Sequence, residues 1–131
     1  MTNENKLIGR IGERAAADLY LENDFKILVR NFYNRRGKML GEIDFVALKN
    51  DHLHFVEIKT RTGGAYGAAL EALTPRKKHR LVRTAQYFLQ HLPCFHNHQA
   101  HFDLVSVALD IFDKSVRKIT IHSDVIDDIL S

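Results

Sequence analysis

The sequence predicts an α/β domain with a mixed central sheet flanked by helices, in the order α-β-β-β-α-β with one further edge strand. Two segments, residues 7–22 and 75–91, carry apolar residues at helical spacing. Four other segments are rich in β-branched, aromatic and aliphatic residues, as strands are: 25–32, 41–49, 52–61 and 101–109. The chain has 131 residues, of which 45% are hydrophobic and 27% charged, which suits one globular domain. We therefore expect a single domain over residues 1–131, with a core of about 8–109 and an acidic C-terminal extension at 110–131.

The first helix is predicted by a narrow apolar face and ends at Asn23-Asp24. The residues of this face are Ile8, Ile11, Gly12, Ala15 and Leu19. The strand predicted at 25–32 leads into a basic loop at 34–38, which contains Arg35 and Arg36.

The next two strands form a hairpin, because only Asn50-Asp51 separates them. A two-residue turn pairs Lys49 with His52, and counting back along both strands places Asp44 opposite Glu57. Opposed side chains have Cβ atoms about 4.5–5.5 Å apart, so two carboxylates there repel each other. A hard cation such as Mg²⁺ or Mn²⁺ would relieve that repulsion.

Lys59 lies on the same face two residues after Glu57, where it would orient a water or stabilise a phosphate. The alternative is a solvated polar face on a surface hairpin. A register slip of one residue would move Asp44 to the other face of the sheet.

The second helix begins at Thr74-Pro75, an N-cap followed by proline at the first helical position, and ends before Leu92-Pro93. A glycine-containing loop with one helical turn precedes it at 62–72. After the helix, residues 101–109 form a strand and 115–122 a short edge strand.

Positive charge is concentrated in part of the chain. The total is +3, but residues 1–101 carry 16 Lys/Arg and 10 Asp/Glu, a net of +6, and residues 102–131 carry 3 and 6, a net of −3. The second helix has Arg76, Arg80 and Arg83 opposite its apolar side and no acidic residue between Thr74 and His91. This pattern favours phosphate binding over a merely solvated face, whereas the acidic tail is interpreted as solvated.

Other compositional features exclude some classes of site. The single cysteine, Cys94, allows no internal disulfide, and together with the lack of an apolar stretch near 20 residues it predicts a cytoplasmic protein with no membrane partner. His and Cys residues cluster at 91–101, but their spacing matches no common zinc motif, so a solvated loop is preferred. Asp103 opens an apolar strand and is expected to be structural.

The carboxylate hairpin resembles a known pattern. Gly41-Glu42-Ile43-Asp44, twelve residues, then Glu57-Ile58-Lys59 is similar to the D-x(n)-E-x-K core of the PD-(D/E)xK nuclease superfamily. The order of elements over about residues 8–109 resembles the YraN family of bacterial predicted endonucleases, which is related to archaeal Holliday junction resolvases. Departures are the acidic tail and His101, where an arginine is common.

The resemblance implies a restriction-endonuclease-like core and Mg²⁺-dependent (or Mn²⁺-dependent) hydrolysis of DNA, with branched or Holliday-junction-like DNA as substrate and a homodimer as the working form. It implies that Asp44, Glu57 and the Ile58 carbonyl hold the metal and that Lys59 activates water.

Glu13 resembles a helix glutamate that contributes to the metal site in related resolvases. It is placed about 130° from the centre of the predicted apolar face, so a solvated helix glutamate is the alternative.

The expected DNA contacts are Arg35, Arg36, Arg61, Arg76, Lys77, Arg80 and Arg83. Two other functions stay open: a non-catalytic nucleic-acid-binding module on the same fold, and a scaffold that contacts a partner through the acidic tail.

Overall fold

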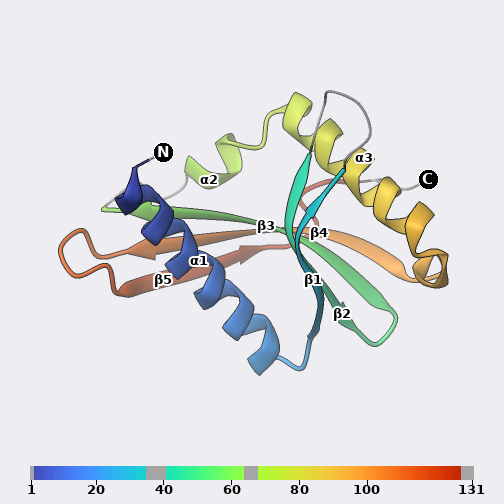
Figure 1. Ribbon diagram of the computed structural model, residues 1–131, viewed down its shortest axis with the longest axis horizontal. Coiled ribbons are helices and arrows are strands. Elements are labelled where there is room, and N and C mark those ends of the chain that lie inside the picture. Colours follow the sequence, from blue (N-terminus) through green and yellow to red (C-terminus); the bar gives the residue numbers. More distant parts are fainter. Residues whose placement is uncertain (1, 35–40, 64–67, 128–131) are drawn as a thin grey trace.

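The structure, a computed structural model, describes residues 2–34, 41–63 and 68–127. A five-stranded sheet in the order β1-β2-β3-β4-β5 separates α1 on one face from α3 on the other (Figure 1). The elements are α1 (Asn3–Glu22), β1 (Lys26–Tyr33), β2 (Glu42–Lys49), β3 (His52–Thr62), α2 (Ala68–Glu71), α3 (Pro75–His91), the short helix η1 (Pro93–Phe95), β4 (Gln99–Leu109) and β5 (Val116–His122). This mixed sheet flanked by helices confirms the predicted fold class and is consistent with a restriction-endonuclease-like core.

Strand pairing follows the connections between elements. β1–β2, β2–β3 and β4–β5 are antiparallel, whereas β3–β4 is parallel and is connected through α3. The expected edge strand is present as β5. The chain then returns along β4, where the Val125 N–H donates to the Phe102 carbonyl (3.0 Å) and Ile126 is buried in the core. Among the described residues, no helix is long and apolar enough to cross a membrane.

Helix α1 begins at Asn3, earlier than the predicted residue 7, because the Thr2 hydroxyl accepts a hydrogen bond from the Asn5 N–H (3.1 Å) and caps it. The predicted apolar face is rotated from the observed one. The buried residues are Gly12, Ala16, Ala17 and Tyr20.

Small residues decide this rotation, since a Cβ on Gly12 would collide with the Thr60 side chain of β3. The helix packs against the sheet mainly through Gly12, Ala16, Ala17 and Tyr20. Ile8, Ile11 and Ala15 of the predicted face are partly buried against the same cluster.

Two apolar layers cover the two faces of the sheet. Phe55, Phe102 and Leu104 pack with Leu81 and Phe88 of α3. On the other face, the layer against α1 contains Phe45, Val56, Val105 and Val107 of the sheet with Ala16, Ala17 and Tyr20 of the helix.

The sheet opens into a fork between β2 and β3. Their pairing runs from Lys49–His52 to Phe45–Val56, which confirms the predicted turn and register. Beyond Val56, β3 continues beside β4 as far as the Thr62–Leu109 pair, while β2 continues beside β1 to the Tyr33–Glu42 pair. The two strands diverge at this point (Figure 1).

Candidate functional site

Asp44 and Glu57 occupy the fork as the next residues after the last β2–β3 pair. The Ile58 N–H donates a hydrogen bond to Asp44 Oδ2 (2.7 Å), and the Asp44 and Glu57 side chains lie close enough for each to shift the pKa of the other. The structure thus brings together the two carboxylates that the hairpin register predicted.

Burial and mutual repulsion control the protonation of this pair. Burial, followed by the charge of Glu57, raises the pKa of Asp44 to about 8, although the Ile58 amide opposes the shift. Burial also raises the pKa of Glu57, against the lowering effect of Lys77. Glu57 Oε2 is buried and has no hydrogen-bond partner. Two such carboxyls need a proton or a cation between them.

Lys59 lies in the same electrostatic environment. Burial lowers the pKa of its ammonium, and the nearby charges of Lys77 and Arg61 lower it further. Its proton is therefore held less tightly than that of a solvated lysine, which suits a group that handles the proton of a water molecule.

A second lysine reaches the carboxylates from α3. Lys77 Nζ lies 3.7 Å from Glu57 Oε1, and both side chains are largely buried. From sequence, Lys77 is expected only as a DNA contact within the basic part of this helix. Its spacing of four and seven residues from the buried Leu81 and Thr84 was a signal that it lies on the inward side of the helix.

Glu13 is half-buried, and the prediction that it lies far from the buried face of α1 is wrong. It shares a stripe with Ala17 and Tyr20, four and seven residues further on, because the true buried face is rotated. Burial, followed by the charge of Glu42, raises the pKa of Glu13, while Arg30 lowers it. Glu13 therefore adds negative charge to the mouth of the fork, where it approaches Glu42.

Glu42 was not among the predicted site residues. The charge of Glu42, followed by partial desolvation and a hydrogen bond to Glu42, raises the pKa of the Tyr33 phenol. Glu42 and Tyr33 therefore form part of the same acidic environment. The pairing of Glu42 with Tyr33 across β1 and β2 explains their contact.

The residues of the fork fit a hard divalent cation held by two carboxylates. In the described parts of the chain, no three His, Cys, Asp or Glu side chains lie close enough to hold a metal by themselves. The third protein ligand would be the Ile58 carbonyl, which points to the same strand edge as the Ile58 N–H that meets Asp44. Mg²⁺ keeps several waters and binds through one or two carboxylates, which this set supplies.

A pocket of about 390 Å³ opens beside Glu57, between the fork and the start of α3. Glu42 and Glu57 line it on one side and Arg76, Lys77 and Arg80 on the other. Gly41 lets α3 approach closely, because a Cβ there would meet Thr84 and lie 2.9 Å from the Arg80 carbonyl.

Of the predicted DNA contacts, Arg76, Lys77 and Arg80 line this pocket, whereas Arg61 and Arg83 do not. Arg80 and Arg61 each have a buried Nε without a hydrogen-bond partner. Arg83 is exposed further along α3. Arg35 and Arg36 lie outside the described residues.

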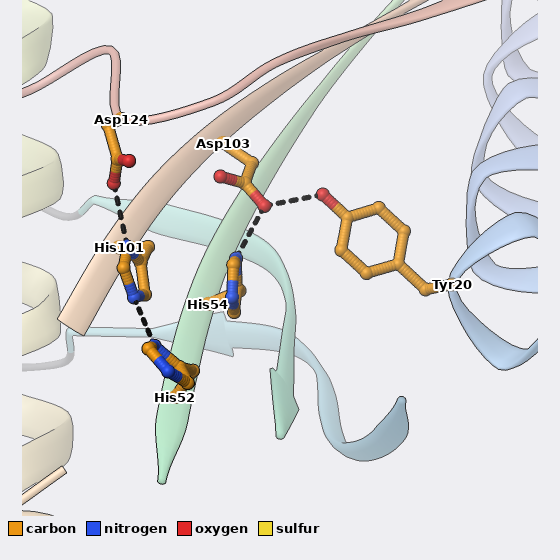
Figure 2. Close-up of polar contacts among 6 residues, drawn as sticks. All are labelled: Tyr20, His52, His54, His101, Asp103 and Asp124. Carbon is orange, nitrogen blue, oxygen red and sulfur yellow. Dashed lines mark hydrogen bonds and ion pairs between the residues drawn. The ribbon is translucent and has the colours of Figure 1, made fainter. Parts of the chain in front are cut away.

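A separate polar cluster lies near the hairpin end of the sheet (Figure 2). The buried Asp103 accepts a hydrogen bond from the Tyr20 hydroxyl through Oδ2, which also lies 2.7 Å from His54 Nδ1. His101 bridges His52 and Asp124, at 2.8 and 2.7 Å. Asp103 is thus hydrogen-bonded within the interface between α1 and the sheet, as its expected structural role requires.

Other histidines near Cys94 make local contacts. His91 and His96 contact the backbone carbonyls of Tyr87 and Pro93. No three His, Cys, Asp or Glu side chains in the described part of this segment lie close enough to hold a metal. The segment expected as a loop contains the short helix η1 and the first residues of β4.

Comparison with known proteins places the chain in a family. The model of the uncharacterised protein family UPF0102 matches residues 12–107. A UPF0102 protein of Acinetobacter baylyi is 39% identical over 75% of this chain and 67% of its own length. A UPF0102 protein of Clostridium botulinum is 38% identical over 85% and 87%, and one of Syntrophomonas wolfei 39% identical over 81% and 88%. The matched region contains the fork, the pocket and α3, and the chain belongs to the UPF0102 family, the YraN family that its motifs resemble.

Proposed function

We propose that this protein is a Mg²⁺-dependent, structure-selective endonuclease that hydrolyses DNA phosphodiester bonds, with branched or Holliday-junction-like DNA as its substrate. One observation carries the proposal: two partly buried carboxylates lie close together at the fork, with one Glu57 oxygen buried and unpartnered and a lysine two residues away. A purely structural hairpin gains nothing from this arrangement, because like charges at opposed positions destabilise it.

Each residue of the fork has a separate role in the proposed reaction. Asp44, Glu57 and the Ile58 carbonyl would hold Mg²⁺ or Mn²⁺, which when bound supplies charge neutralisation and Lewis acidity at a phosphate oxygen. Lys59 orients the attacking water and accepts or returns its proton at Nζ. Glu13, beyond direct reach of a three-ligand cluster, tunes the field at the mouth of the fork.

Recognition of DNA would use backbone phosphates more than bases. Arg76 and Arg80 line the pocket, and Arg61 follows Lys59 on β3. Arginine guanidinium groups bind phosphate in a bidentate manner and carry no sequence information by such contacts. The preference for branched DNA and a working homodimer are the parts of this proposal that rest on the resemblance to junction resolvases.

The test is a cleavage assay on labelled four-way junctions, flaps, single strands and linear duplexes, with Mg²⁺, Mn²⁺ or EDTA. We expect metal-dependent cleavage of a branched substrate and a loss of at least about 100-fold in Asp44→Asn, Glu57→Gln and Lys59→Met. Glu22→Gln, an exposed carboxylate at the end of α1, is the matched control and should keep wild-type activity. Cleavage that survives Glu57→Gln would contradict the site assignment.

A non-catalytic DNA- or RNA-binding module is the second candidate. It is favoured by the basic pocket wall, which needs no metal, and by the lack of a three-side-chain metal cluster among the described residues. Salt-dependent binding that is unchanged in Glu57→Gln, with no cleavage of any substrate in either metal, would select this function.

A further inference from the structure

Among the described residues, Lys77 is the cation that forms an ion pair with Glu57, and it comes from a different element than Asp44, Glu57 and Lys59. Its Nζ lies 3.7 Å from Glu57 Oε1, with 32% of the Lys77 side chain and 14% of the Glu57 side chain exposed. The other carboxylate oxygen, Oε2, stays without a partner. Lys77 therefore contacts only one of the two carboxylate oxygens of Glu57, and the other oxygen has no partner.

A divalent cation between Asp44 and Glu57 would compete with this ion pair. An ammonium about 6 Å from a doubly charged ion disfavours it by about tenfold even in a water-like dielectric. The Lys77 ammonium and the metal thus have an unfavourable interaction as long as both stay at Glu57.

The Lys77 ammonium has a second possible position, at the wall of the pocket beside Glu57. Its four-carbon stem is flexible, and it lines the pocket together with Arg76 and Arg80. A phosphate bound at that wall would offer the ammonium an anionic partner on the side away from the metal. The same side chain can thus serve two anions without movement of the helix.

We propose that Lys77 is an exchangeable counter-ion of this site: it pairs with Glu57 while no divalent cation is bound, and transfers to a DNA phosphate when the cation takes over the carboxylate. The inference rests on the proposed function, because it needs both a metal at the fork and a phosphate in the pocket. It gives Lys77 a role distinct from that of Lys59, which remains beside the metal, and from that of Arg76 and Arg80, which bind phosphate in either state.

The first experiment measures Mn²⁺ affinity of the full chain by calorimetry, without DNA, in wild type, Lys77→Met, Lys77→Arg and Lys78→Met. Lys78 is the matched control, because it is the next residue of α3 and carries the same charge, while Glu57 is paired with Lys77. We expect Lys77→Met to bind Mn²⁺ about three- to tenfold more tightly than wild type. Lys77→Arg should resemble wild type, and Lys78→Met should stay within about twofold of it.

The second experiment measures how binding of a four-way junction depends on salt, in EDTA and in Ca²⁺. If Lys77 moves to a phosphate only when the cation is bound, Lys77→Met lowers the salt slope by about 1 in Ca²⁺ and leaves it nearly unchanged in EDTA. Lys78→Met should change the slope equally in both conditions.

The outcomes separate the two proposals. Mn²⁺ affinity that is equal or weaker in Lys77→Met than in Lys78→Met would overturn the exchange role while leaving the metal site intact. Failure of wild type to bind Mn²⁺, with no effect of Glu57→Gln, would overturn the metal site and the exchange role together.

Discussion

Replacing Asp44 with asparagine should make the metal-free protein more stable. The pKa of Asp44 is about 8 in the folded chain, against an ordinary value of 3.8. In the unfolded chain the ordinary pKa of 3.8 lies about 3.2 units below pH 7, so Asp44 is deprotonated there. In the folded chain Asp44 keeps its proton at pH 7. At about 1.36 kcal/mol per unit, the native state loses at most about 4 kcal/mol of stability.

The expected gain is smaller than this limit. Water and counter-ions reach the pocket beside Glu57, so we expect about 2 kcal/mol, or about 7 °C in Tm for a chain of this length. Asparagine has nearly the same shape, and its carbonyl oxygen can still accept the Ile58 N–H, so no hydrogen bond or cavity offsets the gain.

The pH dependence has a definite sign. Below pH 4 Asp44 is protonated in both the folded and the unfolded chain, so its raised pKa does not change the free energy of unfolding. Between pH 4 and about pH 8 the raised pKa lowers the free energy of unfolding progressively. Wild type should therefore lose stability between about pH 4 and pH 8 in EDTA, and the advantage of Asp44→Asn should be less than half as large at pH 5 as at pH 7.

The assay is urea unfolding followed by circular dichroism, at pH 5, 7 and 8 in EDTA. Glu22→Gln is the control for removal of one exposed carboxylate and should change the unfolding free energy by less than about 0.5 kcal/mol. Unfolding of Asp44→Asn at lower urea than wild type at pH 7, or a gain that is the same at pH 5 and pH 8, would refute the reasoning.

Three further predictions concern the metal and the packing of α1. Mg²⁺ at pH 7.5 should raise the Tm of wild type but not of Glu57→Gln, measured by differential scanning fluorimetry; equal shifts would place the metal elsewhere. Gly12→Ala should lower stability by about 1–3 kcal/mol because its Cβ meets Thr60, whereas Gly9→Ala, which meets nothing within 4 Å, should raise it by about 0.5–1 kcal/mol; urea midpoints that move together would contradict this. Tyr20→Phe should cost about 1–3 kcal/mol, because buried Asp103 loses a hydrogen bond, and unchanged urea unfolding would show that the contact is not needed.

The hairpin could be predicted from sequence because two simple rules act together there. A two-residue turn sets the register, and the period of two along each strand then decides which side chains meet. Asn50 adopts a positive φ of 54° in this turn, which asparagine tolerates better than most residues. The Asp44–Glu57 pairing followed from this register alone.

Helix faces were harder to predict because a narrow apolar stripe does not fix how the helix is rotated on its sheet. Of the face predicted for α1, Gly12 lies against β3 and Ile8, Ile11 and Ala15 are partly buried. The pattern misses Ala16, Ala17 and Tyr20, whose hydroxyl donates to Asp103. Lys77 was expected only as a DNA contact because it belongs to a run of basic residues, although it is aligned with Leu81 on the inward stripe. In both helices the missing information was which strand residue each helix residue meets: Thr60 for Gly12 and Glu57 for Lys77. The pattern of a single helix does not contain this information.

The fork explains why the candidate site lies where it does. Once β2 and β3 diverge, the backbone of Ile58 has no partner strand on that edge. Asp44 accepts a hydrogen bond from the Ile58 N–H, and the Ile58 carbonyl points to the same strand edge. An interrupted ladder normally costs stability, since buried backbone groups need partners. In the proposed metal site this carbonyl would be the neutral ligand that joins two repelling carboxylates, and a hard cation there would offset the repulsion between them.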